Sequence, residues 1–109
     1  MAQKIIDISK YINNDVPQMV LFGKTYTIKN DKKTVLLLTA LQNEQNNNNV
    51  DDKIIKLLIG VEQGQEIIDI LDNNPNYSEN IKVVVLNLLS LATGTPYEVL
   101  EERFRKAQQ

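Results

Sequence analysis

The stretch 76–94, NYSENIKVVVLNLLSLATG, decides the fold of this chain. It predicts a helix over about 78–93 that Asn76 or Ser78 caps and Gly94 ends, because glycine readily takes the left-handed conformation that closes a helix. Its apolar side chains leave only a thin polar stripe, formed by Asn80, Asn87 and Ser90. A helix that is apolar nearly all round is buried nearly all round. We therefore expect the central helix of the protein, with a helix at a subunit interface as the alternative.

The residues that follow predict a second helix at about 95–107. Thr95-Pro96-Tyr97-Glu98 places Thr at the N-cap, Pro at the first helical position and Glu at the third. This order is the pattern of a capping box. The apolar positions that follow at helical spacing are Tyr97, Leu100 and Phe104. A capped C-terminal helix is expected directly after the central one.

Upstream, a helix is expected at about 31–45, with Asn30 or Asp31 as its cap. Its apolar stripe consists of Leu37, Leu38 and Leu41, with Val35 beside it. The polar run Asn46–Asn49 follows. Four residues are too few for a prion-like segment, so we expect a mobile loop over about 43–50.

Two further helices are predicted at about 51–59 and 61–72, with Gly60 between them. Asn73-Asn74-Pro75 ends the second, because proline cannot continue a helix. The first carries the apolar residues Ile54, Ile55, Leu57 and Leu58, and the second is expected to bury Ile67, Ile68, Ile70 and Leu71 on one side. Both helices should therefore present an apolar side to the central helix.

The segment 17–30, PQMVLFGKTYTIKN, reads as a β-hairpin. Two β-prone runs flank Gly23-Lys24, and Gly at the first loop position suits a type II′ turn. With this two-residue loop, Phe22 pairs with Thr25 and Leu21 with Tyr26. One face of the hairpin then carries Met19, Leu21, Tyr26 and Ile28, and the other carries Val20, Phe22, Thr25 and Thr27.

Both hairpin faces bear apolar residues near the turn. The chain's own first segment, KIIDISKYIN, is the simpler cover for the second face, and a partner protein is the alternative. That segment fits both a helical stripe and a strand, and we favour an extended piece followed by a helical turn near 9–13. The expected fold class is α+β, mostly α: one domain over 1–109 with the N-terminal hairpin packed on about four helices.

Composition limits the function. The chain has 109 residues, a net charge of −2 and no Cys. A general nucleic-acid binder needs a basic excess, so no nucleic-acid partner is expected, and the basic cluster Arg103 to Lys106 reads as a solvated helix end. No apolar run approaches the roughly 20 residues that span a bilayer. We expect a cytoplasmic protein with no membrane partner.

The sequence offers little for catalysis. It has no His and no Cys, so the commonest general base and the thiol nucleophile are both missing. Glu62, Glu66 and Asp69 share a helix face, but without a calcium-loop pattern an acidic solvated face is the better interpretation than a metal site. Gly23-Lys24 lacks the rest of a phosphate-binding loop. We expect no enzyme, no cofactor and no metal.

The order of these motifs resembles the tail assembly chaperones of long-tailed bacteriophages of Gram-positive hosts. The resemblance covers nearly the whole chain: FGKTYTIKND at 22–31, KKTVLLLTALQ at 32–42, LLIGVEQGQEIIDIL at 57–71, NYSENIKVVVLNLLSLATG at 76–94 and TPYEVLEERFRK at 95–106. These motifs are hydrophobic patterns and turns, not catalytic signatures.

The resemblance implies a non-catalytic role in the host cytoplasm. Such chaperones bind the tape measure protein, keep this long helical protein soluble, help recruit tail tube protein, and are absent from the finished virion. Self-association into rings or filaments is also implied, as is a longer form made by a programmed frameshift.

Candidate protein-binding residues are Val20, Phe22, Val83 and Leu86, because the hairpin and the central helix carry more apolar surface than a small domain obviously needs. A helix lying in a groove is the natural binding mode. The alternative is that all four residues are core. The rival function is a small phage- or plasmid-encoded regulatory or adaptor protein that also acts by protein binding.

Overall fold

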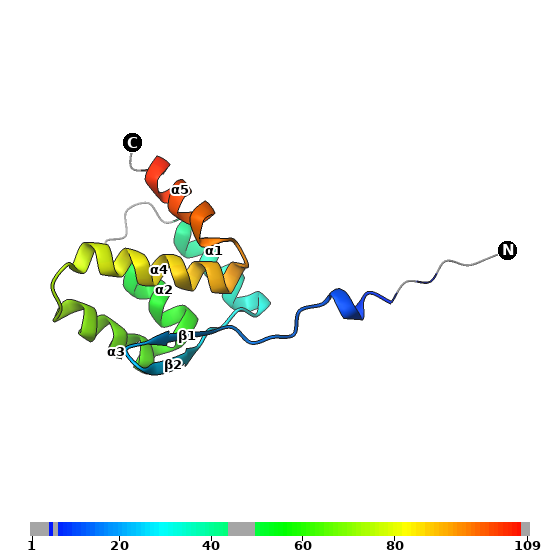
Figure 1. The fold of residues 1–109 in the computed structure, drawn as a ribbon, viewed down its shortest axis with the longest axis horizontal. Coiled ribbons are helices and arrows are strands. Elements are labelled where there is room, and N and C mark those ends of the chain that lie inside the picture. Colours follow the sequence, from blue (N-terminus) through cyan, green and yellow to red (C-terminus); the bar gives the residue numbers. More distant parts are fainter. Residues whose placement is uncertain (1–4, 6, 44–49, 108–109) are drawn as a thin grey trace.

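The computed structural model describes residues 5, 7–43 and 50–107. Within these ranges the chain forms a two-stranded antiparallel hairpin followed by five helices, which confirms the α+β, mostly α class (Figure 1). The elements are a short 3₁₀ helix η1 (Ser9–Tyr11), strands β1 (Gln18–Leu21) and β2 (Lys24–Thr27), and helices α1 (Lys32–Gln42), α2 (Val50–Ile59), α3 (Val61–Asp72), α4 (Tyr77–Thr93) and α5 (Tyr97–Ala107). No helix in these ranges is both long and apolar enough to cross a bilayer.

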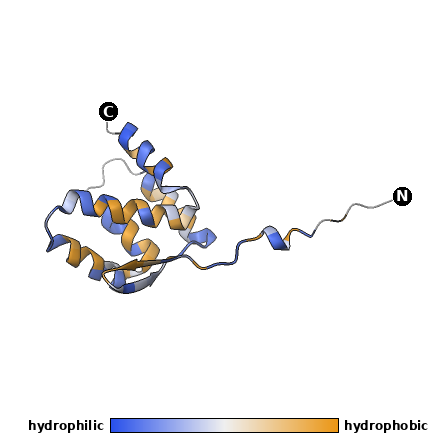
Figure 2. Ribbon diagram, viewed as in Figure 1, coloured by the Kyte–Doolittle hydropathy of each residue, from blue (hydrophilic) through white to orange (hydrophobic). Residues whose placement is uncertain are grey.

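Helix α4 is the central helix, as expected. It packs against α2, α3 and α5 (Figure 1), and much of its ribbon is coloured as hydrophobic in Figure 2. Its buried residues are Ile81, Val84, Val85, Leu86, Leu88, Leu89 and Ala92. Gly94 ends it at φ 76°, where its N–H donates to the Ser90 carbonyl. Burial on several sides explains why so little of α4 is polar.

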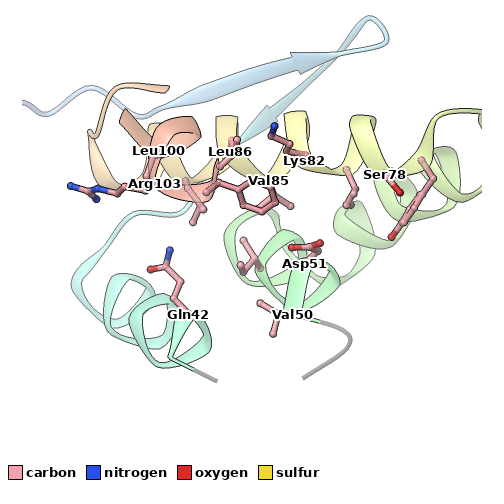
Figure 3. A pocket seen from close by; sticks show the side chains of 14 residues that line it. Gln42, Val50, Asp51, Ser78, Lys82, Val85, Leu86, Leu100 and Arg103 are labelled. Carbon is pink, nitrogen blue, oxygen red and sulfur yellow. The ribbon is translucent and has the colours of Figure 1, made fainter. Parts of the chain in front are cut away.

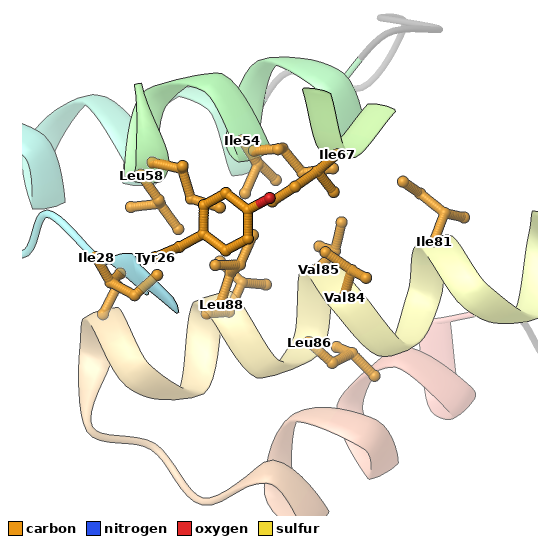
Figure 4. Packing of buried hydrophobic residues seen from close by; sticks show 14 of the residues in the cluster. Tyr26, Ile28, Ile54, Leu58, Ile67, Ile81, Val84, Val85, Leu86 and Leu88 are labelled. Atoms are coloured by element: carbon orange, nitrogen blue, oxygen red, sulfur yellow. The ribbon is translucent and has the colours of Figure 1, made fainter. Parts of the chain in front are cut away.

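The hairpin contributes its inner face to the same core. Tyr26 and Ile28 are buried, and Figure 4 shows the Tyr26 ring between the side chains of α2 and Leu88 of α4. The Lys29 N–H donates to the Leu58 carbonyl at 2.8 Å, which ties the end of the hairpin to α2. The small sheet therefore closes one side of the helical body.

The predicted register of the hairpin is wrong by two residues. Leu21 pairs with Lys24 and Met19 with Tyr26, so the loop is Phe22-Gly23 and not Gly23-Lys24. Both loop residues have positive φ, which is the requirement of a type I′ turn and not of type II′. Because side chains alternate with a period of two, a slip of two residues leaves every face assignment unchanged. The two predicted faces are therefore correct for the residues of the paired strands, whereas Phe22 belongs to the loop and lines a hollow with Leu21 of the inner face.

Three details of the helices differ from expectation. Helix α1 ends at Gln42, and most of the loop expected over 43–50 lies outside the described residues. Leu37 is exposed, and Thr34 joins Leu38 in the buried stripe, since positions four apart share a helix face. The predicted capping box is also wrong: α5 begins at Tyr97, and the Thr95 hydroxyl accepts a hydrogen bond from Thr93.

The described part of the first segment, residues 5 and 7–13, does not cover the outer hairpin face, in contrast to the simpler expectation. Residues 7–16 are exposed and run away from the body, with the expected helical turn present as η1 (Figure 1). The radius of gyration is 16.8 Å. A compact chain of this length would have about 13 Å. The projecting segment accounts for the excess.

Gly64 allows α2 and α3 to pack closely. A Cβ at this position would lie 2.9 Å from Lys56 Cα and 3.2 Å from Lys56 N, both backbone atoms that cannot turn aside. Helix propensity alone favours Ala over Gly by about 1 kcal/mol. The backbone clash should outweigh this gain, because overpacking a tight contact costs about 1–3 kcal/mol. Gly64→Ala should therefore lower the free energy of unfolding in urea titration, whereas its exposed neighbour variant Gln65→Ala should leave it within about 0.5 kcal/mol.

Asp31, the residue before α1, gives a pH dependence. A hydrogen bond from the Thr34 hydroxyl holds the pKa of the Asp31 carboxyl below its ordinary value of 3.8. A lowered folded-state pKa stabilises the protein above 3.8, and this stabilisation is lost as the pH falls through the folded-state value. Asp31→Ala should lower the melting temperature at neutral pH, and the difference from wild type should shrink on acidification. A difference that grows as the pH falls would contradict this assignment.

Candidate protein-binding surfaces

The outer face of the hairpin is open to solvent. Val20 is 68% exposed on this face, and Thr25 and Thr27 lie on the same face. Phe22, in the loop at the end of β1, is 71% exposed. No described residue of the chain buries these two apolar side chains. The sequence placed both residues on one face. The structure keeps Val20 on that face but places Phe22 in the loop, where it lines a shallow hollow with Leu21 and Glu66.

Phe22 occupies an unfavourable backbone conformation. Its φ is 50°, in the left-handed region where a Cβ crowds the following carbonyl, and Gly23 follows at φ 80°. Gly, Asn or Asp normally fill such a turn. The cost to a bulky residue is about 1–2 kcal/mol, and the exposed ring recovers little of it by burial. A cost that the fold does not offset suggests a purpose outside the folded chain.

An exposed ion pair joins the tip of the hairpin to α3. Lys24, on the inner face, donates to Glu66 at 2.6 Å, and its ammonium lies 5.3 Å from the centre of the Tyr26 ring. The hydrogen bond to Glu66 raises the pKa of Lys24 above 10.5, so this side chain stays charged at neutral pH. The buried Tyr26 and the ion pair together present Phe22 on a supported turn.

The two other sequence candidates lie on α4, away from the hairpin turn in the chain. Val83 is 49% exposed. Leu86 is 4% exposed and belongs to the core, in agreement with the alternative interpretation, although it also forms part of a groove wall. The four candidates therefore do not form one continuous surface.

A groove of about 730 Å³ runs between α2, α4 and α5 (Figure 3). We call it the α2–α4–α5 groove. Its apolar lining includes Ile54, Ile81, Val85, Leu89, Leu100 and Phe104. The charged residues that line the groove are the cations Lys82 and Arg103 and the carboxylate Asp51. The Lys82 ammonium lies 5.2 Å from the centre of the Phe104 ring, which fastens α5 to α4 at the rim.

The carboxyl of Asp51 is partly buried beside the apolar walls of this groove. Burial raises the pKa of Asp51 above 3.8, and the neighbouring Asp52 carboxylate adds to the shift. The groove therefore loses negative charge more readily on acidification than a free Asp would allow.

Sequence reasoning missed this groove. It placed Arg103 in a solvated helix end, which holds for Arg105 and Lys106, since they pair with Glu101 and Glu102 at helical spacing. Arg103 is exposed as well, and it also lines the groove. The i, i+4 pair Leu100 and Phe104 was visible in the sequence, but which helices it faces depends on how α5 folds back.

Two of the three acidic residues considered for a metal are already engaged. Glu66 pairs with Lys24, and the Asp69 carboxylate accepts a hydrogen bond from Gln65 at 2.9 Å. Among the residues that the structure describes, no group of three or more His, Cys, Asp or Glu is placed to hold a metal ion.

No family model, curated protein or solved structure matches this chain.

The strain at Phe22 can be measured. Phe22→Asn should raise the free energy of unfolding by about 1 kcal/mol, because Asn tolerates the left-handed conformation and little buried area is lost. Phe22→Ala removes the same ring, but Ala tolerates the left-handed conformation less well than Asn does. The free energy of unfolding should therefore stay nearly unchanged in this variant. Urea titration of both variants compares the two effects. If Phe22→Asn destabilises the protein, the exposed ring contributes to folding and the strain argument is wrong.

Proposed function

We propose that this protein is a non-catalytic chaperone of phage tail assembly that binds the tape measure protein and keeps it soluble. The outer face of the hairpin is the proposed client-binding surface. The observation that carries the proposal is the exposed Phe22 ring on a strained turn, with the exposed Val20 on the adjoining strand β1. The fold gains nothing evident from this arrangement, whereas a partner would.

The chemistry of this face suits an apolar helical client. Two apolar side chains project from a rigid support, with the Thr25 and Thr27 hydroxyls at the margin. Exposed aromatic anchors of this kind contribute much of the binding energy at protein interfaces. A long helical protein that exposes an apolar stripe before assembly could bury that stripe on such a face.

The overall charge supports the same role. A chaperone that exposes apolar surface must itself stay dispersed, and the net charge of −2 with 24% charged residues serves this need. Recruitment of tail tube protein is part of the same proposal, and it rests on the order of the sequence motifs along the chain.

Co-expression tests the proposal. The tape measure protein, taken as the very large helical reading frame next to this gene, is expressed with wild type or with Val20→Asn/Phe22→Asn. We expect wild type to move most of the client into the soluble fraction and the double variant to lose this effect. Leu36→Asn is the matched control, because Leu36 is similarly exposed on α1.

Two outcomes would contradict the proposal. If wild type leaves the client insoluble, the chaperone function fails and the adaptor alternative gains support. If Leu36→Asn is as damaging as the double variant, binding does not depend on the hairpin face.

A further inference from the structure

The N-terminal segment carries apolar side chains that its own body leaves uncovered. We call residues 5 and 7–16 the arm. Ile5, Ile8, Tyr11, Ile12 and Val16 are each more than half exposed. A run of this length with five exposed large apolar residues is unusual on the surface of a soluble domain, where such residues occur singly. The arm therefore has the composition of a segment that docks.

The arm already contains the start of an amphipathic helix. The Asp7 carboxylate accepts a hydrogen bond at 2.9 Å from the N–H of Ser9, the first residue of η1, and Ile8 occupies the N-cap position between them. Continued as an α-helix, this turn would place Ile8, Tyr11 and Ile12 on one side, because they are spaced i, i+3 and i+4. That spacing is the usual anchor pattern of a helix that binds in a groove.

The arm leaves the body in a fixed direction. The Pro17 carbonyl accepts a hydrogen bond from the Ile28 N–H at 2.9 Å, so Pro17 belongs to the hairpin. Proline restricts the preceding residue, Val16, to extended conformations. The arm consequently continues the line of β1 away from the body (Figure 1). To reach the groove of its own chain it would have to reverse, whereas the groove of a neighbouring molecule can lie in its path.

The α2–α4–α5 groove matches the arm in polarity and in charge. Its floor is apolar, and its rim carries the two cations Lys82 and Arg103 against one carboxylate, Asp51. The arm carries the two carboxylates Asp7 and Asp15 against one cation, Lys10. Opposite net charges at the rim would favour the encounter and orient the arm.

We infer that the arm of one molecule docks in the α2–α4–α5 groove of a second copy, with Ile8, Tyr11 and Ile12 as its anchors. A mutual exchange of two arms gives a closed twofold dimer in which both arms and both grooves are covered. This interface is separate from the outer hairpin face, so it stands or fails independently of client binding.

Cysteine cross-linking tests the contact directly, because the native chain has no Cys. Full-length Ile12→Cys and Phe104→Cys proteins with tags of different mass are mixed and oxidised. We expect the mixed disulfide to form several-fold more than with Val61→Cys, an exposed α3 position outside the groove, in place of Phe104→Cys. Equal yields with both partners would overturn the inference.

A second experiment distinguishes docking in a second copy from docking within one chain. In the double variant Ile12→Cys/Phe104→Cys, disulfides should link two chains, and a product that is mainly internal to one chain would overturn docking in a second copy. By sedimentation, wild type should be dimeric and Ile8→Asp/Ile12→Asp monomeric. The charge-matched control Asn13→Asp/Asn14→Asp should remain dimeric. A monomeric wild type, or a dimer that survives the first pair, would contradict the inference.

Discussion

The burial of α4 on several sides is the constraint on which the rest of the structure depends. An isolated 17-residue helix with this composition would expose its apolar circumference to water. Four elements share in covering it, since α2 and α3 pack on one side, α5 crosses another, and the inner face of the hairpin contributes Tyr26 and Ile28. Because each of these elements packs on α4, its own apolar side faces the core. The apolar surface that remains on the outside is therefore surface that the fold itself does not use.

Three such surfaces stand out. The outer hairpin face and its loop expose Val20 and Phe22, the arm holds a helical anchor pattern, and the α2–α4–α5 groove is open beside α5. They differ in support. The hairpin tip is braced by Lys24 and Glu66, whereas the arm is fixed only at Pro17. A supported surface suits recognition of a separate protein. A tethered arm suits exchange between two like molecules, because once one arm has docked, the second arm is held at a high effective concentration near its groove.

Much of the fold could be predicted from the sequence, for local reasons. The helices predicted at 51–59 and 61–72 lie within one residue of α2 and α3, because Gly60 and Pro75 interrupt a clear apolar period. The faces of the paired hairpin residues were also predicted correctly, because side chains alternate between faces with a period of two and a register shift of two residues leaves them on the same face. The register was not, because a positive φ at Phe22 contradicts the preference of a bulky residue and no local rule predicts it. The predictions for Leu37 and for the path of the arm failed for another reason: which side of a helix is covered depends on elements far away in the chain.

The outer hairpin face, which the fold leaves uncovered, is the surface where we expect a protein client to bind. Amide hydrogen exchange of the full chain, with and without the tape measure protein, tests this most directly, because protection reports the backbone segments that a partner covers. We predict added protection over 18–27 and little change over the exposed side of α3. Unchanged exchange over 18–27 in a complex that has formed would contradict binding at this face.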